Sequence, residues 1–133
     1  MPSVNLSDFS ESSFICLHTG QSLRTVTDYY CREAGFMPKV ALESDSPETV
    51  QEFIRTGLGI SFVPQITWGG VGGENVVLVP IASPRCYRYI SLTWDKNREL
   101  PAPAAELKKF IIDHFADFAK SYAAKRFSQF NKH

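Results

Sequence analysis

The order of apolar runs and helical repeats between residues 13 and 64 is the feature that most constrains how this chain can fold. Phe14–Leu17 and Gly59–Pro64 are short apolar runs, and both are typical of buried strands. Apolar residues at helical spacing predict a helix over Leu23–Ala34, and alternation predicts a strand around Val40–Leu42. A second helix fills the interval before Gly57. The pattern therefore predicts an α/β fold, a doubly wound and mainly parallel sheet with helices on both faces.

Local signals predict where both helices begin and end. Ser22 is a suitable N-cap for the first helix, and Gly35 can take the left-handed position after its last turn. Ser46 can cap the second helix, with Pro47 at its first position, and Gly57 ends it.

The second half of the chain predicts two more strands and a long helix. Val76–Pro80 and Tyr87–Trp94 have strand-like composition, and Pro101 introduces an amphipathic helix. The loop before Val76, "WGGVGGEN", is rich in glycine. A phosphate-binding loop needs a helix after it, and here a strand is expected, so we do not favour a phosphate site there.

Composition limits the classes of protein to which the chain can belong. Lys plus Arg equals Asp plus Glu, at 14 each, so the chain lacks the basic excess of a nucleic-acid-binding domain. No apolar stretch is long enough to cross a membrane, and the first 15 residues do not resemble a signal peptide. The three cysteines, Cys16, Cys31 and Cys86, form no C-x-x-C pair. We expect a cytoplasmic protein with reduced thiols and no contact with a membrane.

Signals for catalysis and for cofactors are weak. The histidines and cysteines have no metal-binding spacing, and no nucleotide or nucleophile motif is complete. Glu43 and Asp45 could act as an acid and a base, but carboxylates before a helix more commonly serve as caps. We therefore expect no enzyme activity and no cofactor.

Three predicted turns lie at the carboxyl ends of the predicted strands, where open α/β sheets bind ligands. Free N–H groups at the helix N-termini there favour an anion. The alternative interpretation is that these residues are ordinary caps. The candidate ligand-binding residues are Gly20, Gln21 and Ser22 in the first turn, Ser44, Asp45 and Ser46 in the second, and Pro64 and Gln65 in the third.

Several short pieces of sequence, in this order and spacing, resemble the effector-binding domain of LysR-type transcriptional regulators. They are Leu23-Arg24, Ala34-Gly35-Phe36 with Pro38, Glu43-Ser44, Gly57-Leu-Gly59 ending at Val63-Pro64, and a last strand running into a proline-led helix. The resemblance covers about Phe14 to Phe115. It implies one lobe folded like a type 2 periplasmic binding protein, with an antiparallel return strand.

Members of this family have more parts than the part that this chain resembles. Its members bind DNA through an N-terminal winged helix-turn-helix, hold small molecules between two lobes and act as oligomers. This chain resembles the second lobe and the C-terminal helix only, so the resemblance implies a ligand-sensing fragment whose DNA contacts lie in a missing helix-turn-helix. We expect an entering arm at 1–12, an effector-binding lobe with the return strand at 13–95, and a C-terminal helix and tail at 96–133. The alternative is a stand-alone binding or interaction lobe without a regulatory role.

One branch of the family senses peroxide with a cysteine in the first turn of this lobe and a second cysteine nine residues later. Ser22 occupies the first place here and Cys31 the second. A serine cannot supply the thiolate, so we expect no disulfide switch and interpret Cys31 as a buried helical residue.

The last helix carries a broad apolar stripe that the family would pack on the first lobe. Without that lobe, we expect the stripe to mediate self-association and the chain to form a homo-oligomer. The competing possibility is that the helix folds back on its own sheet. The stripe residues are Leu107, Phe110, Ile111, Phe115 and Phe118.

Overall fold

In the computed structural model the chain divides into two compact units, Met1–Ile90 and Ser91–His133. The structure describes residues 2–130 of the backbone and the side chains up to residue 122. Each unit is considered by itself below.

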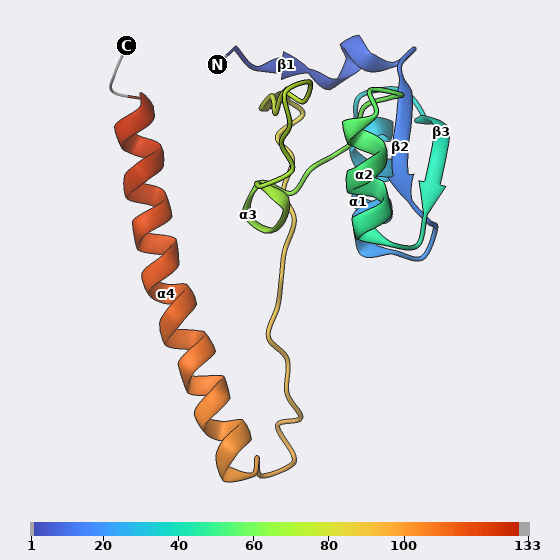
Figure 1. Cartoon of the computed structure of the whole chain (residues 1–133). Helices are drawn as coiled ribbons and strands as arrows, with labels where there is room; N and C mark the ends of the chain where they lie inside the picture. The colour runs from blue at the N-terminus through green and yellow to red at the C-terminus, as the bar shows by residue number, and fades with distance from the viewer. Residues whose placement is uncertain (1, 131–133) are drawn as a thin grey trace. The chain divides into compact units, whose positions relative to one another are not determined.

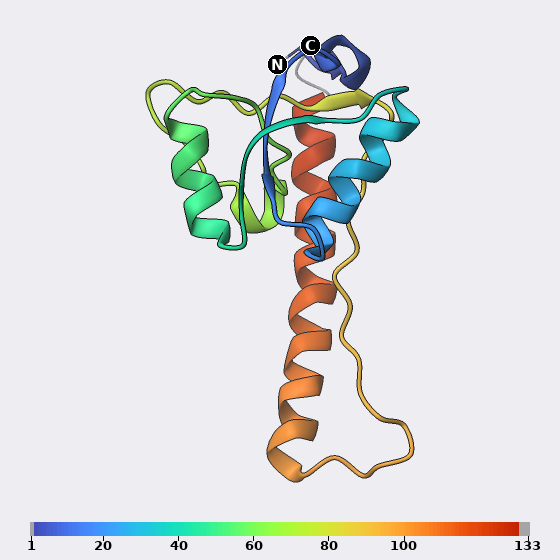
Figure 2. The ribbon, with the colours of Figure 1, turned by 90° about the vertical axis from the view of Figure 1, so that its right-hand side faces the viewer.

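A pair of parallel strands forms the centre of the first unit (Figure 1). β2 (Ser13–Leu17) pairs with β3 (Lys39–Ser44), with Phe14 opposite Val40 and Leu17 opposite Ser44. The connections are α1 (Ser22–Glu33) and, after β3, α2 (Pro47–Arg55). Figure 2 shows the two helices on opposite sides of the strands. This arrangement confirms the predicted α/β fold with parallel pairing and helices on both faces.

β2 is buried on both faces because each face packs in a different hydrophobic cluster. Ile15 and Leu17 pack with α2 residues such as Val50, whereas Phe14 and Cys16 pack with α1 through Cys31. The exposed fractions of these four β2 residues are only 1% to 6%. A continuous apolar run is the pattern that such a doubly covered strand requires.

The first residues of the chain are part of this unit. β1 (Val4–Asn5) pairs in parallel with β4 (Ile81–Ser83), and the short 3-10 helix η1 (Leu6–Phe9) follows β1. Leu6 is 3% exposed and packs in the core that contains Phe14. The arm expected at residues 1–12 thus contributes core residues.

The third predicted strand is reduced to a single bridge. Ile60 pairs with Phe14 through backbone hydrogen bonds to Ser13 and Ile15, and the described chain then leaves the sheet. Pro64 has no N–H to continue a ladder, and it precedes α3 (Gln65–Trp68). The prediction of a full strand at Gly59–Pro64 was therefore wrong.

Two further strand predictions were also wrong. Val76 makes only a bridge to Gly73, and the strand that forms is β4, just after Val76–Pro80. In the part of the chain that the structure describes, Tyr87–Trp94 runs without a strand partner, so the antiparallel return strand is not formed. Strand-like composition alone did not provide a backbone partner.

Most helix boundaries were predicted correctly. Ser46 caps α2 by accepting a hydrogen bond from the Thr49 N–H at 3.3 Å, and Pro47 is the first helical residue. Gly35 and Gly57 have the positive φ angles, 92° and 75°, that end their helices. The N-cap of α1 is Gln21, so the prediction of Ser22 was wrong by one residue.

The second unit contains α4 (Ala102–Phe130), the predicted proline-led helix. Trp94 lies over its first turns, with the Lys108 Nζ 3.9 Å from the indole centroid. None of the described helices is long and apolar enough to cross a membrane.

Candidate functional site

The first two predicted turns lie together at the carboxyl ends of β2 and β3. The Gln21 side-chain amide donates a hydrogen bond to the Asp45 carbonyl at 3.2 Å. The His18 N–H donates to the Ser44 carbonyl at 2.8 Å, directly after the strands end. These contacts join residues 18–21 to residues 44–45, so the two turns form one continuous edge, which we call the rim.

The rim residues have different partners. Gly20 has a φ of 95°, which permits the tight turn between β2 and α1. The Ser44 hydroxyl accepts from the Ser46 N–H at 3.1 Å. Pro64 and Gln65, from the third predicted turn, begin α3 instead, and the hydrogen bonds that join the first two turns involve neither of them.

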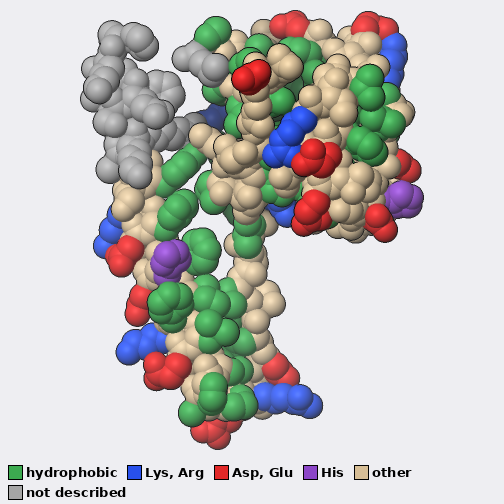
Figure 3. Space-filling model, viewed as in Figure 1, with side chains coloured by type: hydrophobic (Ala, Val, Ile, Leu, Met, Phe, Trp, Pro, Cys, Tyr) green, Lys and Arg blue, Asp and Glu red, His purple; other side chains and the backbone are tan. Residues whose placement is uncertain are grey.

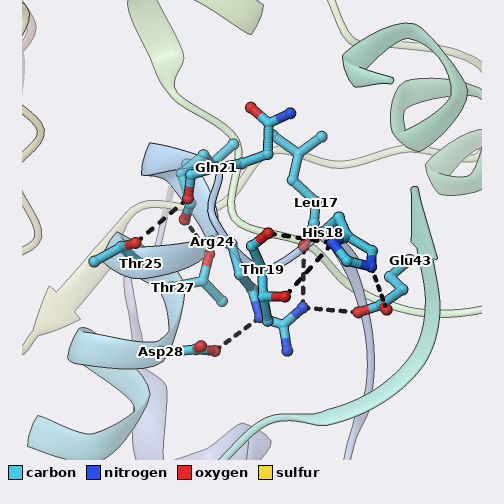
Figure 4. A network of polar contacts seen from close by, with 10 residues as sticks. Leu17, His18, Thr19, Gln21, Arg24, Thr25, Thr27, Asp28 and Glu43 are labelled. Atoms are coloured by element: carbon cyan, nitrogen blue, oxygen red, sulfur yellow. Dashed lines mark hydrogen bonds and ion pairs between the residues drawn. The ribbon is translucent and has the colours of Figure 1, made fainter. Parts of the chain in front are cut away.

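An ion-pair network centred on Arg24 joins α1 to the ends of β2 and β3 next to the rim (Figure 4). The Arg24 guanidinium donates to Glu43 at 2.9 Å, to Asp28 at 3.0 Å and to the Leu17 carbonyl at 3.0 Å. Its side chain is only 13% exposed. Burial alone would lower the pKa of Arg24, but the hydrogen bonds to Glu43 and Asp28 outweigh burial and raise it. The guanidinium therefore stays charged and ties α1 to the ends of both strands.

Sequence reasoning missed this network. The spacing of Arg24 and Asp28, four residues apart on one helix, could have indicated their pairing. The partner on β3, Glu43, also lies 3.5 Å from His18 Nε2. Glu43 thus has a structural role, and Asp45 contributes its backbone carbonyl to the rim. The Glu43 carboxylate thus pairs with Arg24 and His18 rather than capping a helix, and the side-chain cap of α2 is Ser46.

The two helix N-termini at the rim differ in charge. At α2, the Glu48 carboxylate occupies the first turn, where hydrogen bonds from its own N–H and from the Ser46 hydroxyl lower its pKa. At α1, the first turn has no acidic residue, and no side chain of the described chain caps it. The Arg88 guanidinium reaches this end and donates to the Ser22 hydroxyl at 3.3 Å. The end of α1 is therefore the more favourable place for a negative charge.

The cysteines have the environment of unreactive thiols. Cys16 and Cys31 are buried free thiols, and desolvation raises their pKa values to about 11 and about 12. Desolvation also raises the pKa of Cys86 to about 11. Since the thiolate is the reactive form, these values agree with the expected lack of peroxide chemistry. Among the described residues, no group of three His, Cys, Asp or Glu side chains could hold a metal ion.

Parallel strands covered by helices on both faces, with joined turns at their carboxyl ends, define the chain as a lobe of an α/β ligand-binding domain. The family model described as the LysR substrate binding domain matches residues 2–116, and the chain belongs to this family. The resemblance inferred from the sequence motifs is thereby confirmed.

The relatives are bacterial transcriptional regulators. The uncharacterized HTH-type regulator YybE of Bacillus subtilis is 30% identical over 115 residues, which are 86% of this chain and 39% of that protein. The transcriptional dual regulator GltC of the same species is 28% identical, over 85% of this chain and 38% of its own length. The chain thus spans about two-fifths of the length of the curated relatives it matches.

A solved structure has the same fold. The C-terminal domain of a probable LysR family transcriptional regulator from Rhodococcus sp. RHA1 is 33% identical and superposes with a TM-score of 0.52. The match covers 65% of this chain and 43% of that one. This agreement supports a periplasmic-binding-protein-like fold.

Proposed function

We propose that this chain is the effector-sensing part of a LysR-type transcriptional regulator and that residues 13–95 form its ligand-binding lobe. Family membership supports the regulatory role, and the joined turns of the rim support the place of binding. In this proposal the regulator acts in the cytoplasm as an oligomer, and its DNA contacts belong to a helix-turn-helix outside the described residues. The lobe binds its effector without catalysing a reaction.

The proposed effector carries a carboxylate or phosphate that lies at the N-terminus of α1. The observation that carries this assignment is the Arg88 guanidinium beside Ser22 at a helix end without an acidic first turn. Gly20 and Gln21 are the adjoining contacts, and Ser44, Asp45 and Ser46 provide polar groups from the second turn. We also propose contacts from Pro64 and Gln65. These contacts require the start of α3 to move towards the rim when the effector binds.

A titration of the isotopically labelled chain with succinate and with inorganic phosphate tests the site. We expect backbone amide shifts at Gly20, Gln21 and Ser22 that saturate at millimolar ligand, because one lobe encloses only part of a ligand. Arg88→Gln should weaken binding at least several-fold. Arg98→Gln, which removes another exposed guanidinium, is the matched control and should bind as the parent does.

Two results would reject the assignment. One is a set of shifts centred on the glycine-rich loop, Gly69–Gly73. The other is equal loss of binding in the Arg88 and Arg98 variants, which would reveal only a general effect of charge.

The second candidate is an interaction lobe without a regulatory role, which the exposed apolar residues of α4 favour. A gel-shift titration tests whether this chain binds DNA by itself. We expect no sequence-dependent complex at micromolar chain, because acidic and basic residues are equal in number. Submicromolar, sequence-dependent binding would contradict the proposed separation of sensing from DNA contact.

A further inference from the structure

The Tyr30 hydroxyl makes two hydrogen bonds to the backbone of a single residue far along the chain. It accepts from the Tyr87 N–H at 2.8 Å and donates to the Tyr87 carbonyl at 3.2 Å. An antiparallel strand would supply the same pair of groups, one acceptor and one donor, to a residue opposite it. The Tyr30 hydroxyl therefore takes the place of a strand partner at Tyr87, and we call this contact the Tyr30 clamp.

The clamp is built on a side chain whose ring is itself held in place. The Tyr30 ring packs against the buried cluster that contains Phe14 and Cys31. It also meets the Tyr29 ring edge-on, with the two centroids 5.0 Å apart. A ring that is held by packing on α1 presents its hydroxyl at one position, so the backbone of Tyr87 is fixed relative to that helix.

The residues directly after the clamp are exposed. Tyr89 is 90% exposed and Ile90 is 70% exposed. Arg88 is exposed as well, and its guanidinium donates to the Ser22 hydroxyl at 3.3 Å. Tyr87 is thus the anchored residue next to Arg88, and its backbone determines where the long Arg88 side chain begins.

The position of this one guanidinium matters because the charge around it is mixed. The chain has no net charge, and acidic and basic side chains of the first unit are interspersed on the face that Figure 3 shows. A broad surface of one sign would attract an anion without a precisely placed arginine. An exposed arginine also loses side-chain freedom when it binds a ligand, and a backbone that is already fixed reduces this cost.

We propose that Tyr30 is a positioning residue of the effector site: its hydroxyl fixes the backbone of Tyr87 and so places the Arg88 guanidinium at the N-terminus of α1. This inference rests on the proposed function, in which Arg88 contacts the anion. Ser22 and Tyr30 are eight residues apart on α1, which is about 12 Å along the helix axis. Tyr30 therefore acts through Arg88 and not on the ligand itself.

Amide hydrogen exchange tests the clamp separately from binding. In the parent chain, the Tyr87 amide should exchange several-fold more slowly than the Tyr89 amide, relative to their intrinsic rates, because it donates to a fixed hydroxyl. Tyr30→Phe removes the hydroxyl and keeps the ring, so the two amides should then exchange alike. Tyr29→Phe, which removes the neighbouring exposed hydroxyl, is the matched control and should leave Tyr87 slow. A Tyr87 amide that stays slow in Tyr30→Phe would overturn the clamp.

Titration with inorganic phosphate and with succinate tests the positioning role. Tyr30→Phe should weaken binding, followed at the Ser22 amide, by about three- to tenfold, as expected for the loss of one hydrogen bond. Tyr29→Phe should bind as the parent does. Tyr30→Phe combined with Arg88→Gln should bind no more weakly than Arg88→Gln alone, because the hydroxyl acts only through the guanidinium. A merely structural role of the hydroxyl would weaken binding equally in both backgrounds.

Three binding results would overturn the inference. One is Tyr30→Phe binding as tightly as the parent while Arg88→Gln binds weakly, which would leave the proposed function intact. Another is a further loss of binding in the double variant. The third is a parent chain that binds neither anion at these amides, which would reject the proposed function and the role of Tyr30 together.

Discussion

β2 and the segment Tyr87–Trp94 both have the sequence of a strand, and they have opposite fates. Phe14 in β2 is 1% exposed and pairs with a neighbouring strand, whereas Tyr89 in the later segment is 90% exposed. β2 is apolar on both faces, while the later segment alternates polar and apolar residues. A strand forms where both its backbone and its side chains find partners. The later segment has the composition, but the described chain does not offer it a second strand.

The largest expected effect separates the two segments directly. Phe14→Ala should lower the free energy of unfolding by about 3–5 kcal/mol, because it opens a cavity in a fully buried core. Tyr89→Ala should change it by less than about 0.5 kcal/mol, as an exposed side chain leaves no cavity. Urea denaturation followed by circular dichroism measures both. A loss above 2 kcal/mol for Tyr89→Ala would show that the later segment has a packed partner in solution.

The next prediction concerns the bridge that β2 makes with Ile60. An added methyl group on Gly59 would lie 2.6 Å from the Ser13 carbonyl oxygen, which is part of the backbone and cannot turn aside. Gly59→Ala should therefore cost about 2 kcal/mol, within the range for overpacking. Gly70→Ala is the matched control, because a methyl group there meets open space in the described structure. Equal effects of the two changes on the urea midpoint would argue against the close approach.

Alkaline pH should destabilise the core around β2. Burial raises the pKa of Cys16 to about 11, whereas an unfolded thiol ionises near pH 9. Between these values the unfolded state loses a proton that the folded state retains, so stability falls as pH rises, by up to about 1.4 kcal/mol per pH unit for each such thiol. Cys16→Ala should make the dependence between pH 9 and 11 less steep. Cys86→Ala should reduce it by a similar amount, since burial raises the pKa of Cys86, next to the later segment, to about 11 as well.

The smallest predicted effect compares a local cap with a contact of the later segment. Ser46→Ala removes the cap of α2 and should cost about 1 kcal/mol. Ser22→Ala removes only the exposed hydrogen bond from Arg88, for an expected change within about 0.5 kcal/mol. Thermal melts of both variants decide the order. If Ser22→Ala were the more destabilising, the Arg88 contact would hold the later segment more firmly than its exposure indicates.

The sequence predicts those parts of the fold that are determined by residues close together in the chain. Pro47 and the two terminal glycines mark helix ends through their own backbone geometry, and β2 is recognised by its unbroken apolar run. The pairing of β1 with β4 depends on residues that lie far apart in the chain, and periodicity carries no such information.

The candidate site likewise combines features that the sequence predicts with contacts between residues far apart in the chain. Its position at the strand ends follows from topology, and the structure joins Gln21 to Asp45 there. The Arg88 side chain could not be placed beside Ser22 from the sequence, because the two residues are 66 positions apart. The Arg24–Glu43 pair likewise spans two elements, although both residues belong to the motifs that identify the family.

The pairing of β1 with β4 also has a consequence for the order of events during synthesis. The segment from β2 to α2 contains its own main contacts, so it can fold as soon as it has left the ribosome. Leu6, by contrast, lies beside a strand whose partner is made much later, at Ile81–Ser83. Leu6 can pack early against Phe14 and Cys31, but the β1 backbone stays without its strand partner until β4 has been made. Of the strands that pair in the described chain, β1 therefore waits longest for its partner during translation.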